Sequence, residues 1–106
     1  MFVRCAYFEG HVQAQNQARF RDLVTNRLAA TMRTFPGVKA VRVSWGVDFE
    51  VEDRPIYLAL EHAYESPNDL AGALDSPERA GLQSTIEEIN SLFEGRIFHV
   101  NYDVPG

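Results

Sequence analysis

The histidines, and the polar residues that share their strands, are the residues of this sequence best suited to chemistry. A neutral imidazole can move a proton near pH 7 when a neighbouring group orients it. His99 lies in a segment that alternates like a strand, and the alternation predicts that it shares a sheet face with Arg4, Glu61 and Asn101. Two roles are open to this group: a polar network that sets the register of an interface, or a catalytic centre. His62 is expected near the end of its strand, on the other face.

A second set of residues predicts a ligand pocket. Tyr7, Trp45 and Tyr102 are expected on the sheet face that the helices cover, where aromatic rings supply apolar area and a polar group. Arg27 is expected at the core edge of the first helix, where its guanidinium could hold an anion or a carbonyl group. Arg27 and His99 are therefore the two catalytic candidates. The alternatives are ordinary aromatic core packing and an arginine whose stem covers apolar surface.

Neither a metal site nor a cofactor is indicated. The histidines His11, His62 and His99 are dispersed, and a metal needs three or four converging ligands. The glycines form no string of the kind that cradles phosphate or a dinucleotide. Cys5, the single cysteine, can form no disulfide within the chain and is expected to be buried and inert, because a mid-strand position raises the pKa of a thiol.

Length and charge limit the classes of partner. A chain of 106 residues suits one domain, spanning residues 1–106. The net charge of -5 opposes binding to nucleic acid. No apolar run approaches the roughly 20 residues that span a bilayer, and the first residues lack the unbroken apolar stretch of a signal peptide. We therefore expect no nucleic-acid partner, no membrane partner and a cytoplasmic location.

The elements that must position these side chains follow from the hydrophobic periodicity. Apolar residues alternate, as in strands, over residues 2–9, 41–47, 56–61 and 98–104. They recur at helical spacing over residues 15–35, which end at Pro36-Gly37. Ser66-Pro67 and Ser76-Pro77 each place a capping hydroxyl before a proline, so each begins a helix. The second of these helices is expected to end at Gly95, and the acidic segment 48–55 is expected to be an exposed hairpin connection.

The resulting order, β-α-β-β-α-α-β, predicts an α+β, ferredoxin-like fold: a four-stranded antiparallel sheet with helices on one face. The other face should then be polar, yet the alternation leaves apolar residues on both sides. Since a symmetric homodimer is the commonest way to cover such a face, we expect a second copy of the chain there. The expected interface residues are Phe2, Arg4, Arg42, Tyr57, Glu61, His99 and Asn101.

Three local features carry a resemblance to a known family. They are the end of the first helix at Phe35-Pro36-Gly37-Val38, the strand Tyr57-Leu58-Ala59-Leu60-Glu61, and the run from Asp69 to Glu78 in which one helix ends and Ser76-Pro77-Glu78 begins the next. In these the sequence resembles the ethyl tert-butyl ether degradation (EthD)-like proteins of the dimeric α+β barrel superfamily. The resemblance implies facing sheets that form a barrel across a dimer, with a small-molecule cavity in each subunit.

The resemblance also shapes the functional expectation. Many EthD-like proteins carry a histidine and then a proline in the first helix, where this chain has Leu28 and Ala30. We expect a homodimer that binds a small, largely apolar organic molecule, accessory to degradation or secondary metabolism. One alternative is a cofactor-free monooxygenase or isomerase that acts on aromatic or carbonyl compounds. Another is a non-catalytic assembly protein.

Overall fold

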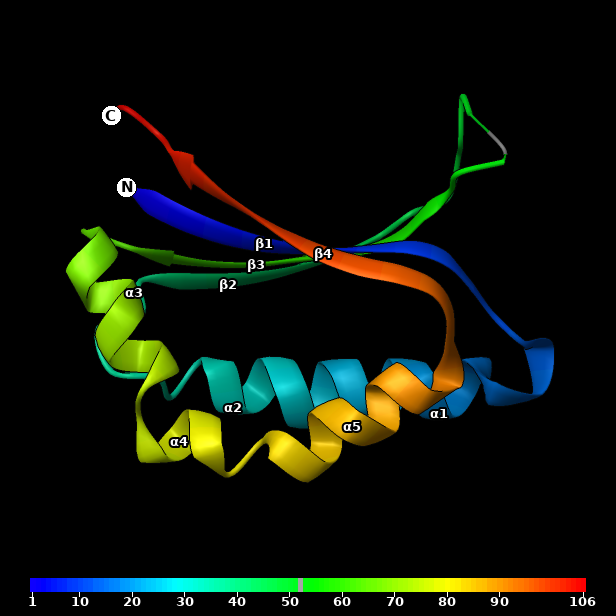
Figure 1. Ribbon diagram of the computed structural model, residues 1–106, viewed down its shortest axis with the longest axis horizontal. Coiled ribbons are helices and arrows are strands. Elements are labelled where there is room, and N and C mark those ends of the chain that lie inside the picture. The colour runs from blue at the N-terminus through cyan, green and yellow to red at the C-terminus, as the bar shows by residue number, and fades with distance from the viewer. Residues whose placement is uncertain (52) are drawn as a thin grey trace.

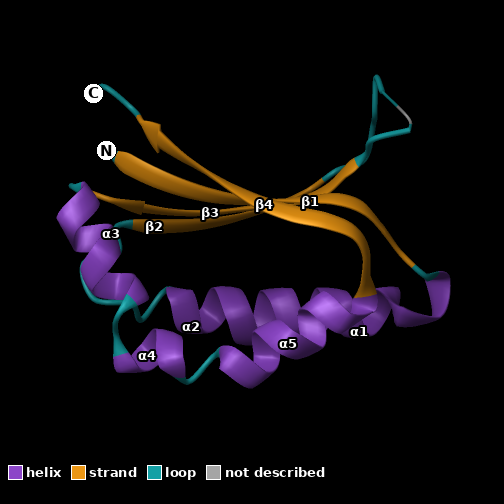
Figure 2. Cartoon of the chain, viewed as in Figure 1, coloured by secondary structure: helices purple, strands orange, loops and turns teal. Residues whose placement is uncertain are grey.

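A computed structural model describes residues 1–51 and 53–106, and Glu52, part of the expected connection 48–55, lies outside the described residues. The strands are β1 (Phe2–Val12), β2 (Ala40–Trp45), β3 (Ile56–Tyr64) and β4 (Phe93–Asp103). They form one antiparallel sheet in the order β2-β3-β1-β4. The helices cover one face of this sheet and leave the other open (Figures 1 and 2). The predicted ferredoxin-like α+β fold is thereby confirmed.

The predicted first helix is one continuous helical segment in which the hydrogen-bonding pattern changes. A 3-10 turn, η1 (Ala14–Asn16), leads into α1 (Gln17–Asp22), a π-helical stretch η2 (Leu23–Ala29) and α2 (Ala30–Met32). Its buried residues recur at the predicted helical spacing and face the sheet. The chain turns away at Gly37, whose φ of +76° lies in the left-handed region that favours glycine.

The second half of the helical layer contains three helices where two were predicted. They are α3 (Pro67–Leu74), α4 (Pro77–Ala80) and α5 (Gln83–Leu92). Ser66 and Ser76 cap α3 and α4 as predicted, because each hydroxyl accepts a hydrogen bond from the backbone N–H three residues later. Gly81 and Leu82 separate α4 from α5, and α5 ends at Leu92 rather than at Gly95.

Strands β1 and β4 are longer than predicted because each passes through a glycine where the two strands approach closely. Gly10 and Gly95 are directly paired, with φ values of +147° and +143°. A Cβ atom on Gly10 would lie 2.1 Å from the Glu94 carbonyl oxygen, and one on Gly95 would lie 2.1 Å from that of Glu9. Only glycine allows this pairing. At its N-terminal end, before this pairing, β4 bends down to meet α5 (Figure 1).

The core lies between the sheet and the helices. At its centre, the Phe20 ring packs against Phe8, Trp45, Tyr57 and Phe93, with ring centroids 5.7 to 6.2 Å apart. Aromatic rings packed in this way contribute beyond the area they bury. Within residues 1–51 and 53–106, no helix is long and apolar enough to cross a membrane.

The strand register corrects the predicted facing of β1 and β4. Phe8 pairs with Leu58 of β3 and with Ile97 of β4, and directly paired residues point to the same face. Because Phe8 and Leu58 are buried under the helices, the even-numbered residues of β1 and the odd-numbered residues of β4 from Ile97 onward face the helices. The prediction had the opposite alternation in these two strands. For β2 and β3 the predicted facing of Val41, Val43, Trp45, Leu58 and Leu60 agrees with the structure.

Most of the predicted interface residues are consequently on the covered side. Tyr57 packs in the core, beside the irregularity in the pairing of β1 with β3. Arg42 and Glu61 do lie on the open face, paired across β2 and β3 and joined by an ion pair of 3.1 Å. The residues that turn toward the helices instead are Phe2, Arg4, Tyr57, His99 and Asn101.

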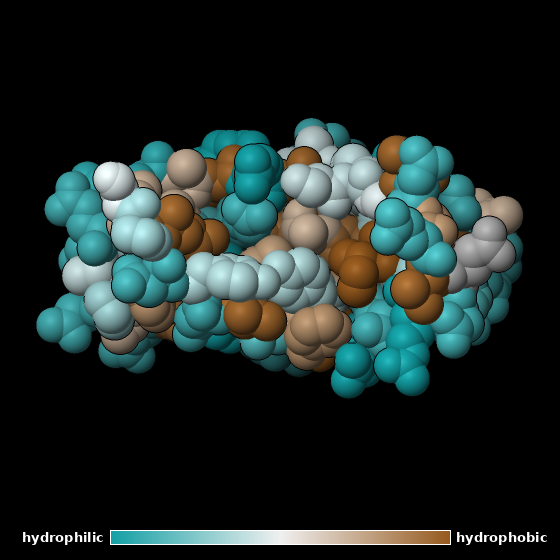
Figure 3. Space-filling model, turned by 90° about the horizontal axis from the view of Figure 1, so that it is seen from above, coloured by the Kyte–Doolittle hydropathy of each residue, from teal (hydrophilic) through white to brown (hydrophobic). Residues whose placement is uncertain are grey.

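The open face of the sheet is apolar along β1 and β4. Cys5 is fully buried there, and the Tyr7 ring stacks on Phe98 at 5.3 Å. Seen from this side, apolar and aromatic side chains run along the middle of the surface and hydrophilic ones gather toward its ends (Figure 3). By register, the residues of this face are Val3, Cys5, Tyr7, Ala40, Arg42, Ser44, Ala59, Glu61, Ala63, Phe98, Val100 and Tyr102.

Candidate functional site

A cavity of about 200 Å³ lies between the sheet and the helical layer. The sheet contributes residues of β1, β3 and β4, the long helical segment contributes Leu28 and Met32, and the remaining walls come from α3, α4 and α5. Mostly apolar side chains enclose a few polar groups, the composition typical of small-molecule sites. The lining residues are Arg4, Ala6, Phe8, Leu28, Met32, Phe35, Leu60, His62, Leu74, Arg79, Leu82, Ile86, Ile89, Asn90, Ile97 and His99.

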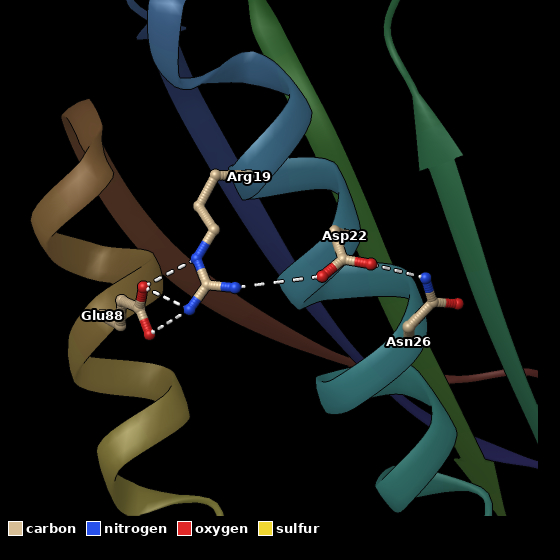
Figure 4. A network of polar contacts seen from close by, with 4 residues as sticks. All are labelled: Arg19, Asp22, Asn26 and Glu88. Atoms are coloured by element: carbon tan, nitrogen blue, oxygen red, sulfur yellow. Dashed lines mark hydrogen bonds and ion pairs between the residues drawn. The ribbon is translucent and has the colours of Figure 1, made fainter.

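Helix α5 forms one wall of the cavity, and a polar network ties it to the long helix. Arg19 Nε and Nη2 donate to the two carboxylate oxygens of Glu88 at 2.9 and 3.0 Å. Asp22, 4.0 Å from Arg19, accepts a hydrogen bond from Asn26 at 2.7 Å (Figure 4). An exposed pair of this kind contributes at most about 1 kcal/mol. Because this contribution is small, the buried Leu82 and Ile89 are what hold α5 on the core, and the network serves to orient the helix.

His62 is the most buried polar group of the cavity. Its Nδ1 is hydrogen-bonded to the Tyr64 hydroxyl at 2.6 Å, and its ring packs edge-on against Phe35. Burial, with smaller contributions from the charges of Arg4 and His99, lowers the pKa of His62 to about 4. Burial also raises the pKa of Tyr64 to about 12. Both groups are therefore neutral near pH 7, and His62 is a weak base there.

His99 lies close to His62 on the same wall, against the prediction that the two point to opposite faces. The two histidines are diagonal to each other across β1, since His62 is paired with Arg4 and His99 with Ala6, the next residue of β1 on the same face. Burial is the main cause that lowers the pKa of His99, and the charges of Arg4 and Arg79 lower it further. His99 is thus a neutral imidazole at the cavity wall, able to accept a proton or to donate a hydrogen bond.

Two arginines complete the polar part of the cavity. Arg4 is paired in register with His62 and Asn101, and its Nη1 donates to Asn101 Oδ1 at 3.2 Å. Arg79 reaches the cavity from α4, which Ser76 caps. The predicted group of Arg4, Glu61, His99 and Asn101 is therefore correct except for Glu61, which lies on the open face.

The structure does not bring the predicted ligand-binding residues together. Tyr7 and Tyr102 lie on the open face, where their hydroxyls are hydrogen-bonded to each other. Trp45 belongs to the edge of the core, with the Arg21 guanidinium 4.4 Å from its ring centroid. Arg27 is exposed on the long helix and does not line the cavity. The predicted placement of Tyr7 and Tyr102 under the helices is wrong because of the facing of β1 and β4, and that of Arg27 at the core edge is wrong because its side chain is rotated outward. Trp45 does face the helices, as predicted, but it does not line the cavity.

Sequence reasoning missed two polar residues of the site. His62 does lie near the end of β3, two residues before Tyr64, as predicted, but the sequence did not show that its side chain is buried in the cavity wall. Arg79 follows the Ser76-Pro77 signal by three residues and therefore occupies the first turn of α4. That signal was visible in the sequence, but the direction of α4 against the sheet was not. Among residues 1–51 and 53–106, no cluster of three histidine, cysteine or acidic side chains is suited to a metal ion.

Solved structures of known proteins share this fold. An EthD family protein from Bacillus halodurans superimposes with a TM-score of 0.78 at 19% identity, covering 99% of each chain. A variant of SnoaB, a cofactor-independent oxygenase from Streptomyces nogalater, gives a TM-score of 0.70 at 15% identity over 99% of this chain and 93% of its own. A dimeric protein of unknown function and ferredoxin-like fold from Bacteroides fragilis gives 0.72 at 11% identity over 97% and 95%. No family model and no curated protein sequence matches the chain.

These similarities define the class of fold to which the chain belongs. It has the ferredoxin-like α+β fold of an EthD family protein over almost its whole length, so the EthD-like resemblance is confirmed at the level of the fold. At identities of 11 to 19%, what is shared is the fold. The chemistry of this chain must therefore be argued from its own cavity. Leu28, at the position expected for the family's histidine, lines that cavity with an apolar side chain.

Proposed function

We propose that this chain forms a homodimer and binds a small, largely apolar organic molecule in the cavity between sheet and helices, as an accessory protein of degradation or secondary metabolism. The observation that carries the proposal is the cavity itself, which has a volume of about 200 Å³. A void lined mainly by leucine, isoleucine, methionine and phenylalanine favours an apolar occupant, because filling it restores contacts that its walls lack.

The homodimer is argued from the open face. The apolar side chains of β1 and β4 on that face, with the stacked pair Tyr7 and Phe98, form a surface that monomers rarely leave bare. Arg42 and Glu61 are its central charges, and they are already paired. A second copy presents the same surface and the same charges, so a twofold association buries apolar area on both copies. The free, buried thiol of Cys5 is consistent with a reducing compartment, and we place the protein in the cytoplasm.

Thermal denaturation with a library of aromatic, aliphatic and carbonyl compounds tests the binding function. A compound that binds the folded chain raises its melting temperature by mass action. Ala6 is half-buried in the cavity wall, so Ala6→Leu fills part of the space, and we expect it to reduce or abolish the thermal shift of each hit. Ala30→Leu, a matched substitution at an exposed position of α2, is expected to leave the shift unchanged.

The outcomes separate the candidate functions. Equal shifts in wild type, Ala6→Leu and Ala30→Leu would place the ligand elsewhere and overturn the cavity site. A library without any hit would favour a protein that serves only in assembly. A hit that the protein converts, on incubation in air, into a compound of different mass or into an isomer would favour an enzyme.

An enzyme is the second candidate because neutral imidazoles and cationic guanidinium groups lie in one apolar cavity. His99 could remove a proton from a carbon next to a carbonyl group, and an arginine would stabilise the enolate. An isomerase returns that proton to another carbon. A monooxygenase passes electrons from the enolate carbon to O₂, so that one oxygen atom becomes a product carbonyl and the other leaves as water. The SnoaB structure shows that this fold is used by a cofactor-independent oxygenase.

A further inference from the structure

The charged groups of the cavity all carry the same sign. Arg4 lies on its sheet wall and Arg79 on its helical wall, and no aspartate or glutamate is among the lining residues. Within residues 1–51 and 53–106, neither guanidinium has a carboxylate oxygen within 4.0 Å. Asp75 lines the shallow depression that adjoins the cavity and includes both arginines, but it pairs with neither. In a chain of net charge -5, this is a local concentration of unbalanced positive charge.

This arrangement is electrostatically unfavourable in the absence of an anion. Both arginines are partly buried and keep their charge at all ordinary pH values. Their hydrogen bonds go to neutral acceptors, Asn101 Oδ1 for Arg4 and Gln83 Oε1 for Arg79. Burial is the main cause of the lowered pKa of Arg4, and the charge of Arg79 is a further cause, so the two guanidinium groups are close enough for Arg79 to repel the charge of Arg4. A negative group between them would relieve that repulsion and gain charge-assisted hydrogen bonds.

We propose that the ligand of this cavity is an amphiphilic acid, whose carboxylate or similar anionic group is held by Arg4 and Arg79 and whose apolar body fills the remaining space. The inference rests on the proposed function and adds the chemical class of the ligand to it. Met32, Phe35 and Ile89 are among the apolar side chains that would contact the body. His99, which carries no charge near pH 7, can donate a further hydrogen bond to the anionic group without adding to the repulsion in the empty site.

Isothermal calorimetry with matched acids and amides tests the inference. The probes are benzoate, 2-naphthoate and octanoate, each against its primary amide, which has nearly the same shape without the charge. We expect at least one acid to bind about tenfold or more tightly than its amide, as the loss of a charged hydrogen bond predicts. Arg79→Met should remove that preference with little effect on amide binding, and Arg79→Lys should retain part of it. Arg27→Met, outside the cavity, is the control.

Nuclear magnetic resonance of the histidine side chains locates the ligand. An anion between the arginines offsets their charges, so the pKa of His99 should rise when the acid binds. Equal affinity for acids and amides, with cavity signals that respond to both, would overturn the anionic class and leave the binding function standing. Binding of library compounds at the cavity without any binding of the acids would do the same. Failure of acids, amides and library compounds alike would overturn both proposals.

Discussion

At the scale of single residues, the structure places two histidines, His62 and His99, on the same cavity wall in different surroundings. His62 is 6% exposed and hydrogen-bonded to Tyr64, whereas His99 lines the cavity with a side chain that is only partly shielded from solvent. Both pKa values are lowered, and loss of solvent around the imidazole is the main cause for each. Because the neutral imidazole of His62 is buried, the free energy of unfolding depends on its protonation. The His99 side chain, in contrast, can contact a ligand in the cavity. His62, which was not a catalytic candidate, thus has the more strongly lowered pKa of the two.

His62 predicts a specific dependence of stability on pH. Its pKa is about 4 in the folded chain against 6.5 for the unperturbed group, so between these values the unfolded chain binds the additional proton. The free energy of unfolding therefore decreases as the pH falls from about 6.5 to about 4, by roughly 3 kcal/mol from this residue alone, and is unaffected by it above that window.

Urea denaturation at pH 7, 5.5 and 4 measures this effect against His62→Gln. Glutamine can keep a hydrogen bond to the Tyr64 hydroxyl but does not titrate, so the variant should lose less stability than wild type over the same pH range. The carboxylates contribute to both proteins and cancel in the comparison. Parallel pH profiles for the two proteins would show that the His62 imidazole is not kept neutral by the fold.

At the scale of elements, the two serine caps differ in what they hold. Ser66 Oγ accepts one hydrogen bond, from the Asp69 N–H at 3.2 Å. Ser76 is 6% exposed and makes two, accepting from the Arg79 N–H at 3.2 Å and donating to the Ala73 carbonyl at 2.6 Å. Ser76 therefore connects the last turn of α3 with the first turn of α4, the turn that carries Arg79 to the cavity.

This difference predicts unequal costs for two identical substitutions. Ser66→Ala removes an N-cap at the surface and should lower the free energy of unfolding by about 1 kcal/mol. Ser76→Ala removes the N-cap and also the hydrogen bond that the buried Ser76 hydroxyl donates to the Ala73 carbonyl, so it should lower the free energy of unfolding by about 2 kcal/mol. Chemical denaturation of the two variants under the same conditions checks the order. A larger loss for Ser66→Ala would contradict the role assigned to Ser76.

At the scale of the whole molecule, the sheet separates two surfaces with different tasks. The helix-covered face bounds the cavity, and the open face carries the apolar side chains for which we propose a second copy. Apart from Leu74 of α3, the exposed large hydrophobic residues of the described chain lie in two places. Val47, Phe49 and Val51 lie in the connection between β2 and β3, and Met1, Tyr102 and Val104 lie at the paired ends of β1 and β4. The connection rises above the open face in Figure 1, where it would meet a partner.

A charge placed on the open face should disrupt the association without unfolding the protomer. Val100 of the edge strand β4 pairs with Cys5 of β1 on that face, and Val100→Glu puts an unpaired carboxylate into the proposed interface. Native mass spectrometry at micromolar concentration should show dimer for wild type and monomer for Val100→Glu, with unchanged circular dichroism. Ala71→Glu, an exposed position of α3, should remain dimeric. A wild-type protein that is monomeric under these conditions would refute the dimer.

The sequence by itself determined the order of the elements. Helical spacing up to Phe35, the Pro36-Gly37 stop, and the Ser-Pro pairs at Ser66 and Ser76 act through local backbone and capping chemistry, which depends little on the rest of the chain. In β2 and β3, the alternation of apolar residues also predicted correctly which side chains face the helices. These local signals were sufficient for the fold class, and the apolar character of both sheet faces was visible in the same pattern.

Only the tertiary structure decided which alternation of β1 faces the helices. Phe2, Ala6 and Phe8 are as apolar as Val3, Cys5 and Tyr7, so hydropathy does not distinguish the two sides, and a shift of one residue exchanges them. Packing resolves the choice, because Phe8 fits edge-on against both Phe20 and Phe93 at 5.9 and 5.2 Å. That contact between residues far apart in the chain turns Arg4 and His99 into the cavity and Tyr7 out of it.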